Sequence, residues 1–189
     1  DPQNLNIIKS QIDKIFEKAQ SSKDPVVKNL IDNPLFSKKI NKKKINQNLE
    51  NYGNQINESL NKILNDFDDA IFIGEDILDP YGGAFKIAKN LSSNFTHQVI
   101  STSISEALIT GLAGGYSIMG GKSIVEIMFG DFLTLSFDQI LNHVCKYQKM
   151  YNINENMHFM IRTPMGGRRG YGPTHSQSIE KHFLGVDNL

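Results

Sequence analysis

The stretch QVISTSISEALITGLAGGYSIMGG, from Gln98 to Gly121, decides the fold of this chain. It begins with a short β-branched run, which favours a strand. Ser103 and Ser105 follow, and serine often caps the N-terminus of a helix. The Ala, Leu, Ile and Gly segment after them ends at Gly120. The stretch therefore predicts a buried strand that leads directly into a buried, glycine-rich helix.

One carboxylate, Glu106, lies in the first turn of this predicted helix. The helix dipole and the free backbone N–H groups of a first turn favour an anion. In open α/β sheets, ligands bind in the crevice outside the carboxyl ends of the strands. Glu106 is therefore a candidate site residue, and a plain helix-start glutamate is the alternative interpretation.

The composition limits the class of protein. The chain has 189 residues and a formal net charge of +0, and 39% of its residues are hydrophobic, which suffices for one sizeable core. The charge balance indicates neither a nucleic-acid nor a membrane partner. Because the apolar runs are too short to span a bilayer, we expect a cytoplasmic protein, or a mitochondrial matrix protein if the source is eukaryotic.

Residues 1–66 predict a helical arm with a linker. Two sets of apolar residues recur there at helical spacing, one ending before Asp24-Pro25 and one from Ile45 to Leu64. A lysine-rich stretch at 38–44 lies between them. It is either a solvated linker or an interaction patch.

From residue 67 onward, strands alternate with helices. Strands are predicted at 70–74, 98–102, 122–129 and 157–162, and helices at 85–91, after Ser105, at 132–151 and near Ser176. This alternation predicts an α/β fold, a parallel sheet with helices on both faces, preceded by the arm. We therefore divide the chain into residues 1–66 and 67–189. The single cysteine, Cys145, lies among apolar residues and is expected to be a buried structural thiol.

Polar, aromatic and glycine-rich residues follow each predicted strand. Because the carboxyl ends of parallel strands meet at one edge, these residues should converge on one crevice: Glu75, Glu106, Met128, Phe129, Asp131, Phe132, Arg162 and the loop 163–178 with His175. His175 could stabilise an oxyanion or shuttle a proton, or it could simply pin the loop. Neither a phosphate-binding glycine motif nor metal-ligand spacing occurs, so we predict no metal site.

Residues 74–91, 101–143 and 160–186 together resemble a known family. They contain GEDILDPYGGAFKIAKNL, the ISE and EIMFGDF motifs, and a GG…THSQS loop. These motifs resemble the transketolase-like pyrimidine-binding domain in the beta subunit of the thiamine-diphosphate-dependent decarboxylating component of 2-oxo acid dehydrogenase complexes. The arm looks like the C-terminal tail of the alpha subunit. The resemblance thus implies a piece of a fused alpha-beta chain, truncated at the C-terminal end of the domain.

The resemblance implies a role for each candidate residue. Glu106 matches the glutamate that hydrogen-bonds a ring nitrogen of the aminopyrimidine of thiamine diphosphate. Met128 and Phe132 match the apolar residues that pack on this ring, and His175 matches the histidine that faces the substrate. The implied reaction is the oxidative decarboxylation of a 2-oxo acid with acyl transfer to lipoamide.

The resemblance also implies partners. The family binds the diphosphate and magnesium through a GDG…NN motif, which this sequence lacks. An alpha-type diphosphate-binding domain or subunit would supply it, so this fragment alone should be inactive. A lipoyl-bearing acyltransferase component is the second implied partner, and the apolar helix at 106–119 predicts a homo-oligomer. A transketolase-type or acetoin-cleaving enzyme, and a non-catalytic assembly domain of the same fold, remain alternatives, and the substrate 2-oxo acid stays open.

Overall fold

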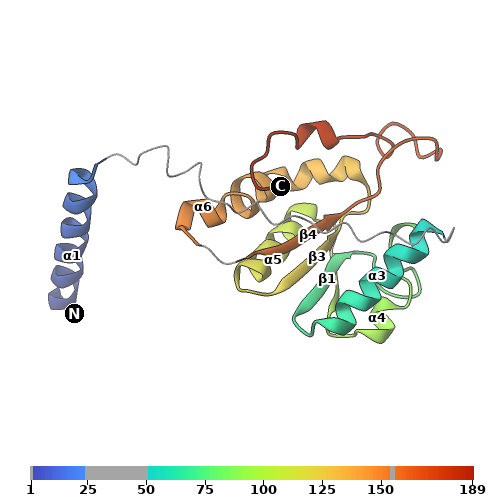
Figure 1. Ribbon diagram of the computed structural model, residues 1–189, viewed down its shortest axis with the longest axis horizontal. Helices are drawn as coiled ribbons and strands as arrows, with labels where there is room; N and C mark the ends of the chain where they lie inside the picture. The colour runs from blue at the N-terminus through green and yellow to red at the C-terminus, as the bar shows by residue number, and fades with distance from the viewer. Residues whose placement is uncertain (1, 24–50, 154–155) are drawn as a thin grey trace, which may run out of the picture. The chain divides into compact units, whose positions relative to one another are not determined.

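The computed structural model describes residues 2–23, 51–153 and 156–189 (Figure 1). Contacts divide the chain into two units, Asp1–Gln47 and Asn48–Leu189. In the first unit, α1 (Pro2–Ser21) is the first helix that the sequence predicts, and its apolar residues are exposed. The lysine-rich stretch 38–44 lies outside the described residues. Among the described residues, no helix combines the length and hydropathy needed to cross a membrane.

The second unit is built on one four-stranded parallel sheet, which confirms the four predicted strands. Its strands are β1 (Ala70–Glu75), β2 (Val99–Thr102), β3 (Lys122–Glu126) and β4 (His158–Arg162), in the order β2-β1-β3-β4. In the register of the sheet, Glu75 lies beside Thr102, and Glu126 lies beside Arg162. The last residues of neighbouring strands are therefore aligned at one edge.

Helices cover both faces of the sheet, as predicted (Figure 1). α3 (Tyr52–Asp66) and α4 (Leu91–Asn94) pack on the face that receives Ala70 and Phe72 of β1. α5 (Glu106–Ile118) and the helical segment 130–151 pack on the opposite face, which receives Ile71 and Ile73. Successive residues of β1 therefore enter different cores, because side chains alternate across a strand.

The unit that contains the sheet begins earlier than the sequence division at 66 and 67. α3 places Leu60 and Leu64 in the core against Phe72, and these two leucines are 3% and 1% exposed. The second helix predicted for the arm is therefore part of the sheet unit, which starts at Asn48. The likeness of residues 1–66 to an alpha-subunit tail stays a prediction.

The segment 85–91 is not the helix that the sequence predicts. Ala84–Lys86 forms one 3-10 turn, and Phe85 within it has a φ of 59°. Asn90 also has a positive φ, 66°, and its N–H donates to the Asp79 carboxylate at 2.8 Å. These left-handed residues interrupt the α-helical backbone, so the apolar spacing here does not produce a regular helix.

The predicted helix 132–151 is helical but changes pitch. It consists of a 3-10 helix Gly130–Ser136, a π-helix Gln139–Val144 and α6 (Tyr147–Tyr151). The Cys145 N–H donates to the Ile140 carbonyl, five residues earlier, at 3.0 Å. Both side chains are buried, so this wider turn keeps them on the core side. The buried Cys145 confirms the structural thiol, and burial raises its pKa.

The prediction of a helix near Ser176 is also wrong. The only helical element there is a 3-10 turn, Glu180–His182. The backbone of Gln177 is held instead by neighbouring segments, because its N–H donates to Asp131 at 3.4 Å and its carbonyl accepts from the Gly166 N–H at 3.2 Å. These bonds tie Gln177 to the segment after β3 and to the loop that precedes it.

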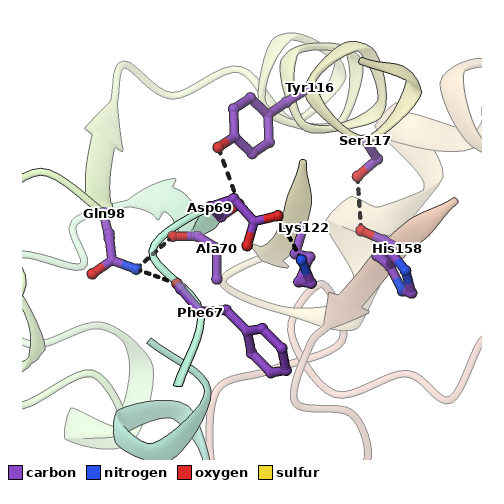
Figure 2. Close-up of polar contacts among 8 residues, drawn as sticks. All are labelled: Phe67, Asp69, Ala70, Gln98, Tyr116, Ser117, Lys122 and His158. Carbon is purple, nitrogen blue, oxygen red and sulfur yellow. Dashed lines mark hydrogen bonds and ion pairs between the residues drawn. The ribbon is translucent and has the colours of Figure 1, made fainter. Parts of the chain in front are cut away.

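The amino end of the sheet carries a network of paired polar groups (Figure 2). Lys122 Nζ lies 2.5 Å from Asp69 Oδ2, and the Tyr116 hydroxyl donates to the Asp69 carbonyl at 3.0 Å. The Gln98 amide donates to the carbonyls of Leu64, Phe67 and Ala70 at 3.1, 2.9 and 2.9 Å. This network joins α3, α5 and the starts of three strands.

Candidate functional site

The carboxyl end of the sheet brings together the side chains that the sequence places after the strands. Glu75 and Glu126 end β1 and β3, and Arg162 ends β4. Glu106 begins α5, four residues after β2. Glu75, Glu106 and Glu126 are 7%, 6% and 2% exposed, so this edge holds three buried carboxylates.

Glu106 is fixed through its backbone. Its carbonyl accepts a hydrogen bond from the Ser136 hydroxyl at 2.9 Å, and the Thr110 hydroxyl donates to Ser136 at 2.8 Å. Both hydroxyl groups are fully buried. Ser105 occupies the N-cap position as predicted, but its side chain makes no cap hydrogen bond. Glu106 is thus held against the segment that carries Phe132, although its side chain has no hydrogen-bond partner among the described residues.

Glu75 lies close enough to Glu106 to be affected by its charge. Burial raises the pKa of Glu75 most, and the charges of Glu106 and then Asp76 raise it further. One Glu75 oxygen, Oε2, is buried without a hydrogen-bond partner in the described part of the chain. The sequence indicated Glu75 as a residue after a strand, but it gave this carboxylate no role.

Glu126 forms an ion pair with Arg162, which is the last residue of the neighbouring strand β4. Burial raises the pKa of Glu126 from 4.5 to about 7, although the charge and hydrogen bond of Arg162 oppose this rise. Glu126 Oε2 also has no partner among the described residues. Sequence reasoning missed Glu126 because it lies inside the predicted strand 122–129. A charged residue in an otherwise apolar strand was the available signal.

His175 lies in a cluster of aromatic rings. Its ring contacts those of Phe129 and Phe132 edge to face, with centroids 4.8 and 5.1 Å apart. The Thr174 hydroxyl lies 2.9 Å from His175 Nδ1. Phe129 also contacts Tyr171, with centroids 5.6 Å apart. His175 is half-buried, so its ring has an apolar setting and remains accessible to a ligand.

Asp131 holds the loop that carries His175. It is 9% exposed, and its Oδ1 accepts a hydrogen bond from the Gln177 side-chain amide at 2.7 Å. The Gly130 N–H donates to the Pro164 carbonyl at 2.9 Å, which fastens the other end of the same loop. The loop is therefore attached at both ends to the segment that follows β3.

The structure brings together only some of the predicted site residues by direct contact. Phe132 and His175 touch each other, and Glu106 is anchored to the same segment as Phe132. Met128 is half-buried after β3. Within the described ranges, no hydrogen bond or ring contact joins Met128 or the Glu106 side chain to His175. Across these same ranges, no three His, Cys, Asp or Glu side chains converge as metal ligands.

Comparison with known proteins identifies a matching family and several relatives of this chain. The family described as "Transketolase, pyrimidine binding domain" matches residues 51–189. Pyruvate dehydrogenase E1 component subunit beta of Porphyra purpurea is 38% identical over 118 residues, which cover 62% of this chain and 35% of that protein. The mitochondrial subunit of the same name from Saccharomyces cerevisiae is 32% identical over 135 residues, covering 71% of this chain and 37% of that protein.

A differently named relative has similar coverage. Acetoin:2,6-dichlorophenolindophenol oxidoreductase subunit beta of Bacillus subtilis is 29% identical over 146 residues, covering 71% of this chain and 43% of that protein. The chain therefore matches between 35% and 43% of the length of these three relatives.

Proposed function

The chain belongs to the family of transketolase pyrimidine-binding domains, and on this premise we propose that it forms the pyrimidine half of a thiamine-diphosphate site in a 2-oxo acid dehydrogenase. The observation that carries this proposal is the buried Glu106 at the start of α5, on the carboxyl side of the sheet. Relatives named as beta subunits of pyruvate dehydrogenase support the reaction class.

The residues at this edge fit the aminopyrimidine of the cofactor. The Glu106 carboxyl group forms no hydrogen bond with another described residue. It can therefore hydrogen-bond a ring nitrogen of the cofactor. Met128 and Phe132 are half-buried and offer apolar surface for a flat ring. Glu106, Met128 and Phe132 would therefore hold the pyrimidine. The diphosphate and its magnesium would be held by an alpha-type partner.

Glu106 and His175 each have a defined task in the proposed reaction. When bound, thiamine diphosphate supplies the electron sink for decarboxylation of a 2-oxo acid. Glu106 would hydrogen-bond a ring nitrogen of the pyrimidine and would take up or release a proton at its carboxyl oxygen. His175 donates a hydrogen bond, or a proton, to the reacting oxygen of the substrate, and the Phe129 and Phe132 rings hold it in place. Acyl transfer to a lipoyl-bearing acyltransferase component completes the proposed function.

The test is the substitution Glu106→Gln in the enzyme assembled with its alpha-type partner. Gln keeps the shape of Glu106 and can hydrogen-bond the ring, but it cannot exchange a proton with it. We expect hydrogen–deuterium exchange at the thiazolium carbon of bound cofactor to fall about a hundred- to ten-thousandfold, with cofactor occupancy retained. Glu58→Gln, on the exposed side of α3, is the matched control and should leave the rate unchanged.

Equal exchange rates at equal occupancy would show that Glu106 is a structural residue and would refute the proposed function. Acetoin cleavage is a second candidate, because relatives named acetoin:2,6-dichlorophenolindophenol oxidoreductase subunit beta also match. Turnover of pyruvate and of acetoin by the same assembled enzyme separates the two reactions. The exposed Leu108 and Leu112 on α5 support the predicted association with further subunits.

A further inference from the structure

A cleft of about 620 Å³ opens beside the aromatic cluster. Its walls come from the first turn of α3, from residues 85–90 and from the loop after β4. Phe85 lines the cleft and also contacts Phe129 and Tyr171, with ring centroids 6.4 and 6.3 Å apart. Because Phe129 also contacts His175, ring contacts connect the lining of the cleft to His175.

The charges that line this cleft are of one sign. Lys86, Lys89, Arg162 and Arg169 line it, and none of its lining residues is Asp or Glu. The charge of Arg162 is compensated by its ion pair with Glu126. In the part of the chain that the structure describes, the other three cations form no ion pair with a carboxylate. Concave sites lined by one sign of charge concentrate ligands of the opposite sign.

Arg169 contacts one of the aromatic rings that line the cleft. Its guanidinium lies 4.4 Å from the centroid of the Phe85 ring, which orients the side chain without neutralising it. A planar guanidinium can bind a carboxylate through two parallel hydrogen bonds. Thr163 adds a buried hydroxyl without a partner among the described residues, and this residue also lines the cleft.

We propose that this cleft binds an anionic substrate and that Arg169 recognises its carboxylate. The proposal rests on the proposed function and extends it, because it makes Arg169 the residue that selects a 2-oxo acid over an uncharged donor such as acetoin.

Binding of an unreactive pair of ligands tests this selection in the assembled enzyme. Oxamate carries the carboxylate of a small 2-oxo acid, and ethyl oxamate is its uncharged ethyl ester. In Arg169→Gln, calorimetry should show Kd for oxamate rising about ten- to hundredfold, because a charge-assisted hydrogen bond is lost. Kd for ethyl oxamate should change less than about twofold. KM for pyruvate should rise in parallel with Kd for oxamate, while kcat changes less than about threefold.

Arg168→Gln is the matched control. Arg168 is the preceding residue, carries the same charge and is exposed, but it does not line the cleft. It should leave both dissociation constants unchanged. The inference is overturned if Arg169→Gln weakens both ligands equally, if it weakens neither, or if Arg168→Gln has the same effect. Thiazolium-carbon exchange in the wild-type enzyme reports separately on the proposed function, since it requires Glu106 and no substrate.

Discussion

The two ends of the sheet differ in how their polar groups are satisfied. At the amino end, Gln98, Asp69 and Lys122 are each bonded within the chain (Figure 2). At the carboxyl end, the buried Oε2 atoms of Glu75 and Glu126 have no hydrogen-bond partner among the described residues. Buried polar groups are normally paired, so the amino end is built for stability. The carboxyl end holds groups that cost stability, as sites that bind ligands do.

The largest effect on stability is therefore expected at the amino end. In Gln98→Ala, the carbonyls of Leu64, Phe67 and Ala70 lose a shared donor. We expect the free energy of unfolding to fall by about 2–3 kcal/mol in urea titrations of the 189-residue chain. The specific activity of the assembled enzyme should not change.

His97→Ala provides the control for Gln98→Ala, because His97 is the exposed neighbour in sequence. It should change the free energy of unfolding by less than about 0.5 kcal/mol. If Gln98→Ala left stability unchanged, the network at the amino end would not be what stabilises the sheet, and the contrast between the two ends would fail.

Sequence patterns predicted the scaffold better than the polar groups within it. The four strands follow from apolar, β-branched runs. Glu106 and His175 lie after strands as their sequence positions indicate, and their roles stay predictions. Phe85 and Tyr171 were not predicted as members of the His175 cluster. Phe85 joins it through a left-handed backbone conformation, which apolar spacing does not reveal. Glu126 was missed because its pairing with Arg162 depends on the adjacency of β3 and β4.

The irregular helices show the same limit. Residues 132–151 have helical spacing, but the π-helical turn at Gln139–Val144 arises from packing Ile140 and Cys145 into one core. The segment after His175 has a helix-like sequence, but Asp131 holds Gln177 in a different conformation. In both segments, contacts between residues distant in sequence override local propensity.

The Glu126–Arg162 pair predicts a pH-dependent effect of intermediate size. The folded-state pKa of Glu126, about 7, is above its ordinary value of 4.5, so ionisation of Glu126 removes stability as pH rises between these values. In Arg162→Met the folded-state pKa rises further, so the loss continues above about pH 7. The gap in free energy of unfolding between wild type and variant should be constant below about pH 7. Above it, the gap should widen by up to about 1.4 kcal/mol per pH unit.

Urea titrations at about pH 6 and about pH 8.5 measure this change, which amounts to at most about 2 kcal/mol. Arg169→Met is the matched control, because Arg169 has no carboxylate partner in the described residues. The difference in free energy of unfolding between wild type and Arg169→Met should not vary with pH. In the Glu126→Gln background, adding Arg162→Met should change the free energy of unfolding by the same amount at both pH values. A gap that is equal at both pH values in Arg162→Met would contradict the assignment of a buried, charge-coupled Glu126.

The smallest expected effect is a gain in stability at Glu75. Its folded-state pKa is raised by burial, by Glu106 and by Asp76, so its ionised form costs stability. This cost is absent below the ordinary pKa of 4.5, grows as pH rises toward the folded-state pKa and is constant above it. Glu75→Gln should therefore raise the free energy of unfolding by about 0.5–1 kcal/mol at neutral pH and by less at about pH 4.

A double-mutant cycle with Glu106→Gln shows whether the gain at Glu75 comes from the site itself. If the charges of the two carboxylates repel each other, each substitution removes the same repulsion, so the double variant gains less than the sum of the two single variants. Glu58→Gln on α3 is exposed, so it should add independently to either change. Full additivity between Glu75 and Glu106 would mean that burial and Asp76, without a contribution from Glu106, destabilise the ionised form of Glu75. A loss of stability in Glu75→Gln at neutral pH would show that its carboxylate is satisfied in the folded chain, and the contrast between the two ends would not extend to β1.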